Sequence, residues 1–168
     1  MDIATLANLI NAVAVTAGVI FAAIQIQHYR QRQRRDAMLE LVRSFQSASF
    51  VRAFRHIISL PDDVGKKEIS ELLGADAEDF VHIVALTWES LGVLVFRREV
   101  TLDLVDDLFS GPILVSWRKL SRYVSEQRAI LQRETAFEWF QWLSEQMTER
   151  EKKSPPTPAH IAHRAWRA

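Results

Sequence analysis

The stretch AEDFVHIVALTWESLGVLVF, residues 77–96, decides the fold that we predict for this chain. Between Phe80 and Phe96 its clearly polar residues are His82, Thr87, Glu89 and Ser90. A helix that is apolar around most of its circumference is typical of the centre of a helical bundle. A membrane span is less favoured here, because Glu89 falls in the middle of a short apolar run. We therefore expect a buried central helix surrounded by other helices.

The flanking segments also follow helical spacing. Before the central helix, we expect a helix that bends near residues 47–49 and stops before Pro61, and then a short helix that ends at Gly74. Asp76 is expected to cap the central helix, and Arg97 and Arg98 to close it.

After the central helix, Thr101 should start a short helix, which the Ser-Gly-Pro sequence at residues 110–112 should end. A further helix from Pro112 to about residue 131 and a last one over residues 134–150 complete the prediction. The first of these should bury the following apolar side chains: Leu114, Trp117, Leu120, Tyr123 or Val124, and Leu131. No segment requires a β-strand, so the predicted fold class is all-α.

Length and charge limit the classes of protein. The chain has 168 residues and no cysteine, which excludes disulfides, zinc–thiolate sites and thiol catalysis. Its net charge is zero, but residues 1–60 carry +4, residues 61–110 carry −8 and residues 111–168 carry +4. The acidic middle is expected to face basic surface within the fold or on a second copy. A nucleic-acid-binding protein would be more basic than this.

The N-terminal segment predicts a membrane anchor. Residues 3–24 contain no Asp, Glu, Lys, Arg or His, and as a helix they would span about 33 Å, close to the hydrocarbon core of a bilayer. Asp2 precedes this run and Arg30, Arg32, Arg34 and Arg35 follow it. This order is the reverse of a secretory signal peptide. By the positive-inside rule it predicts an N-terminus outside and the bulk of the chain in the cytoplasm, at the inner (plasma) membrane of the cell.

The same segment predicts contacts within and beside the membrane. Small and polar residues share one stripe of the helix, which lets two helix backbones approach closely; the stripe contains Asn8, Asn11, Ala14, Val15, Gly18, Ala22 and Gln25. Its expected partners are spans of other membrane proteins or of other copies of this chain. The four arginines are expected to bind anionic lipid headgroups.

Three further stretches carry a resemblance: RSFQSASFVRAFR at residues 43–55, TWESLGVLVFRREVTLDLVDDLFSGPILVSWRKLSRYV at 87–124, and AFEWFQWL at 136–143. Over residues 3–148 the chain resembles an uncharacterised family of small bacterial proteins. The resemblance implies one N-terminal membrane helix followed by a helical cytoplasmic domain of unknown function. It implies no activity, cofactor or catalytic residue.

Candidate polar sites are few. Glu89 lies on the buried helix and needs a partner, for which Arg118 is our candidate and Arg122 an alternative, as a structural ion pair. The neighbouring acids Asp106 and Asp107 point to different sides of a helix. His160 and His163 are one helical turn apart but lack an evident third metal ligand. The sequence has no phosphate-binding glycine loop, GxSxG or HExxH motif, so we expect no enzyme and no cofactor or metal.

Aromatic residues near the C-terminus predict partner contacts. In the core, we expect a stripe of Ala136, Phe140, Leu143 and Met147, which would leave Trp139 and Trp142 toward the rim. These two tryptophans either form a second buried face or contact a protein or a membrane surface. Trp166 lies in a proline-rich basic tail that is expected to be extended when alone.

Together these observations predict four parts: an anchor (residues 1–27), a basic juxtamembrane segment with a helical extension (28–60), a helical domain (61–150) and a tail (151–168). The function that we expect is a non-enzymatic single-pass membrane protein that serves as an accessory subunit, adaptor or assembly factor of a membrane complex. The alternative is a membrane-tethered homo-oligomeric scaffold or a sensor and signalling module.

Overall fold

The computed structural model describes residue 2 and residues 15–29, 42–43 and 45–167. Their regular elements are all helical and include no strand, which confirms the all-α prediction for this part of the chain. Residues 15–29 form one helix; the others are α2 (Ala48–Ser59), α3 (Lys66–Leu73), the 3₁₀ helix η1 (Gly74–Asp76), α4 (Ala77–Phe96), α5 (Leu102–Leu131), α6 (Glu138–Lys153) and α7 (Ala159–Ala162). The chain divides into two compact units, Met1–Arg43 and Ser44–Ala168.

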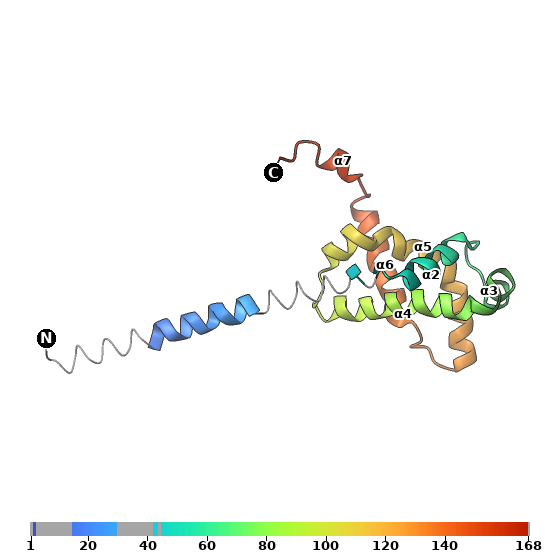
Figure 1. The fold of residues 1–168 in the computed structure, drawn as a ribbon, viewed down its shortest axis with the longest axis horizontal. Helices are drawn as coiled ribbons and strands as arrows, with labels where there is room; N and C mark the ends of the chain where they lie inside the picture. Colours follow the sequence, from blue (N-terminus) through green and yellow to red (C-terminus); the bar gives the residue numbers. More distant parts are fainter. Residues whose placement is uncertain (1, 3–14, 30–41, 44, 168) are drawn as a thin grey trace. The chain divides into compact units, whose positions relative to one another are not determined.

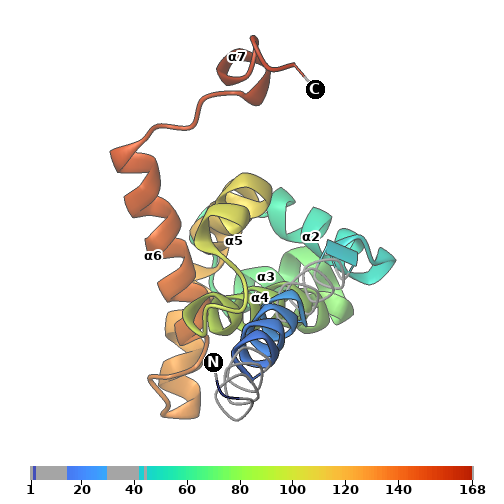
Figure 2. The same ribbon diagram turned by 90° about the vertical axis from the view of Figure 1, so that its left-hand side faces the viewer.

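Helix α4 is the centre of the second unit, as predicted. It packs against both α2 and α6, and Figures 1 and 2 show these two helices on different sides of it. Its inward side chains are fully enclosed: Val81, Val84, Ala85, Trp88 and Leu91. Within the described residues, the stretch Lys66–Phe96 is the one long and apolar enough to cross a membrane. Since α4 supplies the core, this burial accounts for its apolar composition.

The helix ends follow local sequence signals. Ser47 caps α2 by accepting a hydrogen bond from the Phe50 N–H, and α2 stops at Leu60, immediately before Pro61. Gly74 ends α3 with a φ of 72°, and Thr101 caps α5. Asp76 occupies the N-cap position of α4 but makes no capping bond with its side chain, so that part of the prediction is wrong. Helix α2, grouped above with the juxtamembrane segment, belongs to the second unit.

Helix α5 is continuous from Leu102 to Leu131, so the predicted break at residues 110–112 is wrong. Pro112 lies inside the helix, where it removes one backbone hydrogen bond. Val105 before it and Ile113 after it are both fully buried. The helix therefore continues because its two halves are held in the same core.

A buried hydrogen-bond chain supports α5 just beyond this proline. The Trp88 indole N–H donates to the Ser116 hydroxyl at 3.0 Å, and that hydroxyl donates to the Pro112 carbonyl at 2.8 Å. Satisfying the indole is necessary because Trp88 is fully enclosed. Phe45, the first core residue of the second unit, lies against Trp88 and against Phe109 of α5, with ring centroids 5.0 and 4.0 Å apart.

The predicted buried face of α5 is partly right. Leu120, Tyr123 and Val124 are buried, whereas Leu114 and Trp117 are half-buried. The prediction for Leu131 is wrong: its side chain is 58% exposed. It is the last residue of α5, where Gln132 turns the chain into the left-handed conformation and away from the core.

Helix α6 begins at Glu138, four residues later than predicted, because Phe137 adopts a left-handed conformation with a φ of 55°. The predicted core stripe is confirmed for Phe140, Leu143 and Met147, all fully buried. The first turn of α6 lies very close to α4 at Gly92. A Cβ atom there would come within 2.5 Å of the Trp139 carbonyl oxygen, so this position requires glycine.

We predict that Gly92→Ala lowers the free energy of unfolding by about 1–3 kcal/mol, because the added methyl group pushes the α6 backbone away from α4. Gly111→Ala in α5 is the matched control, since a Cβ there meets nothing within 4 Å. That change should be neutral or stabilise by up to about 1 kcal/mol, from the higher helix propensity of alanine. Thermal unfolding in mild detergent measures both, and equal stability of the two variants would contradict the close approach.

Candidate interaction surfaces

The first candidate surface is the helix over residues 15–29. Every one of these residues is exposed, among them Val15, Val19, Ile20, Phe21, Ile24 and Ile26. Of the predicted stripe, Val15, Gly18, Ala22 and Gln25 lie on this helix, and a Cβ at Gly18 would meet nothing within 4 Å. Asn8, Asn11 and Ala14 lie outside the described residues, as do Arg30, Arg32, Arg34 and Arg35. A helix with such apolar side chains on all sides exposes surface that a lipid or protein environment normally covers.

The second candidate site is the carboxyl group of Glu89, and here the sequence prediction is wrong. Glu89 Oε2 accepts a hydrogen bond from the Phe140 backbone N–H at 2.8 Å, and a second backbone interaction comes from Trp139. Arg118, its predicted partner, lies on an exposed part of α5 and pairs with Asp62 at 3.1 Å. The other candidate, Arg122, bonds Glu68 and Glu126.

Glu89 therefore acts as the N-terminal cap of α6. The N-cap residue of that helix, Phe137, makes no capping bond through its side chain. The first turn of a helix has free N–H groups, and a carboxylate is a good acceptor for them. Glu89 and Gly92 are three residues apart on one face of α4, so the glycine admits the first turn of α6 and the glutamate bonds it. An isolated glycine within an apolar helix was the sequence signal for this contact, and our sequence analysis missed it.

Burial raises the pKa of the Glu89 carboxyl above its ordinary value. The backbone N–H groups of Phe140 and Trp139 oppose this by favouring the ionised form, and the nearby Glu138 adds to the rise. Loss of solvent is the largest effect. The side chain thus has a structural task, and the structure gives it no cationic partner within hydrogen-bonding distance among the described residues.

The charge asymmetry of the sequence is resolved within the second unit. Asp62 pairs with Arg118 and Lys119, and Arg150 bonds Asp103 at 2.6 Å and Asp106 at 3.0 Å. Lys119 and Arg118 hold the pKa of the Asp62 carboxyl below its ordinary value. The acidic middle therefore faces basic side chains of α5 and α6, which is one of the two arrangements that we predicted.

Trp139 and Trp142 lie half-buried on α6 and form a cluster with Phe96 of α4. Ring centroids of Phe96 are 4.7 Å from Trp139 and 6.2 Å from Trp142, and the two tryptophans are 5.9 Å apart. Phe96 itself is 59% exposed. The cluster thus packs against α4 on one side and presents aromatic surface on the other. Trp166 belongs to a different region, the tail, and is 73% exposed.

The described residues contain further polar groups outside these surfaces. A shallow hollow of about 400 Å³ is lined by four acids, Asp62, Asp63, Glu68 and Glu71. Of these, Asp62 and Glu68 pair with cations of α5. Burial raises the pKa of Tyr123 to about 12, and its hydroxyl makes no hydrogen bond. Among the described residues no three His, Asp or Glu side chains gather in a way that holds a metal ion, His160 and His163 included.

The fold and these surfaces define a small all-helical domain joined to an exposed apolar helix. The domain family DUF4760, described as a domain of unknown function, matches residues 12–147, and the chain belongs to this family. No curated protein matches the chain significantly, and no solved structure does.

The cap formed by Glu89 predicts a specific pH dependence. Because its pKa is raised in the folded state, the carboxyl favours folding in its protonated form, and this contribution is lost as the pH rises through the folded pKa. Glu89→Gln keeps an acceptor for the Phe140 N–H without titrating. As the pH rises above the ordinary pKa of a glutamate, the wild-type chain should lose unfolding free energy relative to Glu89→Gln.

Denaturant unfolding of both proteins at several pH values measures this difference. Glu89→Ala is the control, because it leaves the Phe140 N–H without its acceptor and should cost about 1–2 kcal/mol throughout the pH range. Parallel pH profiles of wild type and Glu89→Gln would contradict the assignment.

Proposed function

We propose that this protein is a non-enzymatic, single-pass membrane protein whose helical domain serves as an adaptor or accessory subunit of a membrane complex. The observation that carries the proposal is the exposure of every residue in the apolar helix of residues 15–29, beside a second unit with a complete core of its own. Exposed apolar surface of this extent requires a cover, and because residues 3–24 carry no charged side chain, a bilayer is the natural one. The proposed site is the inner membrane, with the second unit in the cytoplasm.

The two units would then have different roles. The apolar helix would anchor the chain and pack against another span through the stripe around Gly18, where the absence of a side chain lets a neighbouring backbone approach. The arginines Arg30, Arg32, Arg34 and Arg35 would hold the membrane surface. In the second unit the aromatic cluster of Phe96, Trp139 and Trp142 is the proposed protein contact, since aromatic side chains dominate the binding energy of many interfaces.

Anchoring can be tested with charges in the apolar helix. Val19→Arg with Ile20→Arg should move most of the protein from carbonate-washed membranes to the soluble fraction, because each buried arginine costs about 2.5–3.5 kcal/mol on insertion. The matched control is Val51→Arg with Ile58→Arg, which makes the same chemical change at two exposed positions of α2. The control should stay in the membrane. Release of the wild-type chain by carbonate would refute the anchor.

Packing of the span can be tested with Gly18→Ile. The larger side chain should reduce crosslinking of the intact protein in membranes several-fold, because it keeps the neighbouring backbone away. Ala23→Ile, a similar enlargement on a different face of the helix, should leave crosslinking unchanged. Products at multiples of the chain mass would identify a homo-oligomer, whereas products with other proteins would identify the complex it serves. Crosslinking that is insensitive to both changes would rule out the stripe as an interface.

A further inference from the structure

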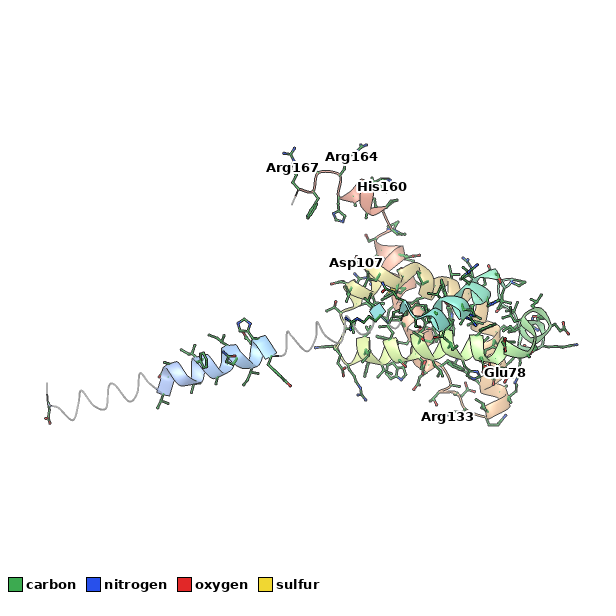
Figure 3. All side chains as sticks on the ribbon, viewed as in Figure 1. Glu78, Asp107, Arg133, His160, Arg164 and Arg167 are labelled. Carbon is green, nitrogen blue, oxygen red and sulfur yellow. The ribbon has the colours of Figure 1, made fainter. Side chains whose placement is uncertain are left out.

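We propose that the tail, residues 152–167, binds the anionic surface of the membrane and gives the second unit an attachment additional to the apolar helix. This inference rests on the proposed membrane anchoring. It concerns a segment that the bundle does not use, since all of residues 152–167 are exposed. Figure 3 shows His160, Arg164 and Arg167 along this segment, pointing away from the helices of the bundle.

The tail has a net positive charge. No Asp or Glu follows Glu151 in the sequence, whereas Lys152, Lys153, Arg164 and Arg167 are all cationic. Lys152 pairs with Glu149 at 2.7 Å, and the other three have no ion pair within the described part of the chain. Each basic residue near an anionic leaflet adds to the attraction, and no acid in the segment opposes it.

The tail also exposes large apolar side chains. Ile161 is 58% exposed and Trp166 is 73% exposed, so the tail presents two large side chains that the bundle leaves uncovered. Tryptophan with neighbouring arginines is the composition that favours the interface between lipid headgroups and acyl chains. Pro155, Pro156 and Pro158 keep the preceding segment extended, which holds these side chains away from the bundle.

A membrane fits this segment better than a protein pocket. Helix α7 in the tail has only four residues. In the sequence of the tail, prolines and alanines separate Lys152 and Lys153 from Arg164 and Arg167. A protein partner would need a fixed arrangement of side chains to read. A lipid surface requires only net positive charge and side chains that can insert, and both are present.

The base of the tail is held on α5. The hydroxyl of Ser110 on α5 donates to Glu151 at 3.4 Å, and Arg150 bonds Asp106, so the base of the tail is fixed on the first half of α5. Phe45, near the start of the second unit, stacks on Phe109, the residue before Ser110. The start of this unit and the base of the tail thus contact neighbouring residues of α5.

The absence of cysteine in the chain makes a site-specific test possible. Ala162→Cys, labelled with an environment-sensitive fluorophore in the full-length protein, reports on the tail. The protein is reconstituted into vesicles of phosphatidylcholine alone or of phosphatidylcholine mixed with phosphatidylglycerol. The label should shift to shorter wavelength in the anionic vesicles and not in the neutral ones, and high salt should reverse the shift. The same label at Ala129→Cys, an exposed residue near the end of α5, should not respond.

Charge variants show whether the shift depends on the tail cations or on the total charge of the protein. Arg164→Gln with Arg167→Gln should abolish the shift at residue 162, and Trp166→Ala should reduce it several-fold. Lys67→Gln with Arg133→Gln removes the same charge from exposed positions of α3 and of the segment after α5, and should leave the shift intact.

An unshifted label in anionic vesicles would overturn the inference. So would a shift of equal size in both kinds of vesicle, or one that appears in detergent and depends on protein concentration, which would assign the tail to a second copy. Vesicle flotation separates the two proposals: if the protein floats but the label does not shift, anchoring stands and the tail inference fails. If it does not float, the anchor itself is refuted.

Discussion

The second unit depends on the contact between the first turn of α6 and the middle of α4. Gly92 lets the α6 backbone come close enough for the Glu89 carboxyl to reach the Phe140 N–H. That bond caps a helix whose own N-cap residue supplies no side-chain acceptor. From this fixed start, α6 places Phe140, Leu143 and Met147 in the core. A half-buried carboxyl group with a raised pKa thus joins α4 to the first turn of α6.

Aromatic packing also fixes α4 at Trp88, four residues before Gly92. Trp88 lies among Phe45, Phe50 and Phe109, and its indole N–H is bonded to Ser116 beyond the proline of α5. These contacts hold both halves of α5, which explains how one helix continues through Pro112. Since Phe45 and Glu151 contact α5 at neighbouring residues, the same region of α5 holds the start of the unit and the base of the tail.

Charged residues differ between the bundle and the tail. Four acids of residues 61–110 pair with α5 and α6 cations, namely Asp62, Glu68, Asp103 and Asp106, and these pairs tie the loop after α2 and the end of α6 to the bundle. Such exposed pairs contribute little individually, about 0–1 kcal/mol each. In the tail, Lys152 pairs with Glu149, whereas Lys153, Arg164 and Arg167 have no ion pair among the described residues. Two segments of the chain have every described residue exposed: the apolar helix of residues 15–29 and the tail.

The sequence by itself determined the helical class, the central position of residues 77–96, and most helix ends, because these follow from hydrophobic spacing and from local residues such as Ser47, Gly74 and Thr101. Tertiary structure decided the partner of Glu89, the continuity of α5 and the exposure of Leu131. Each of these depends on which segments distant in sequence come together. The free-energy cost of a proline inside a helix can be exceeded by burial of the residues on both sides of it. A carboxyl group bonds the donor that packing brings within reach, which need not be the cation that sequence spacing suggests.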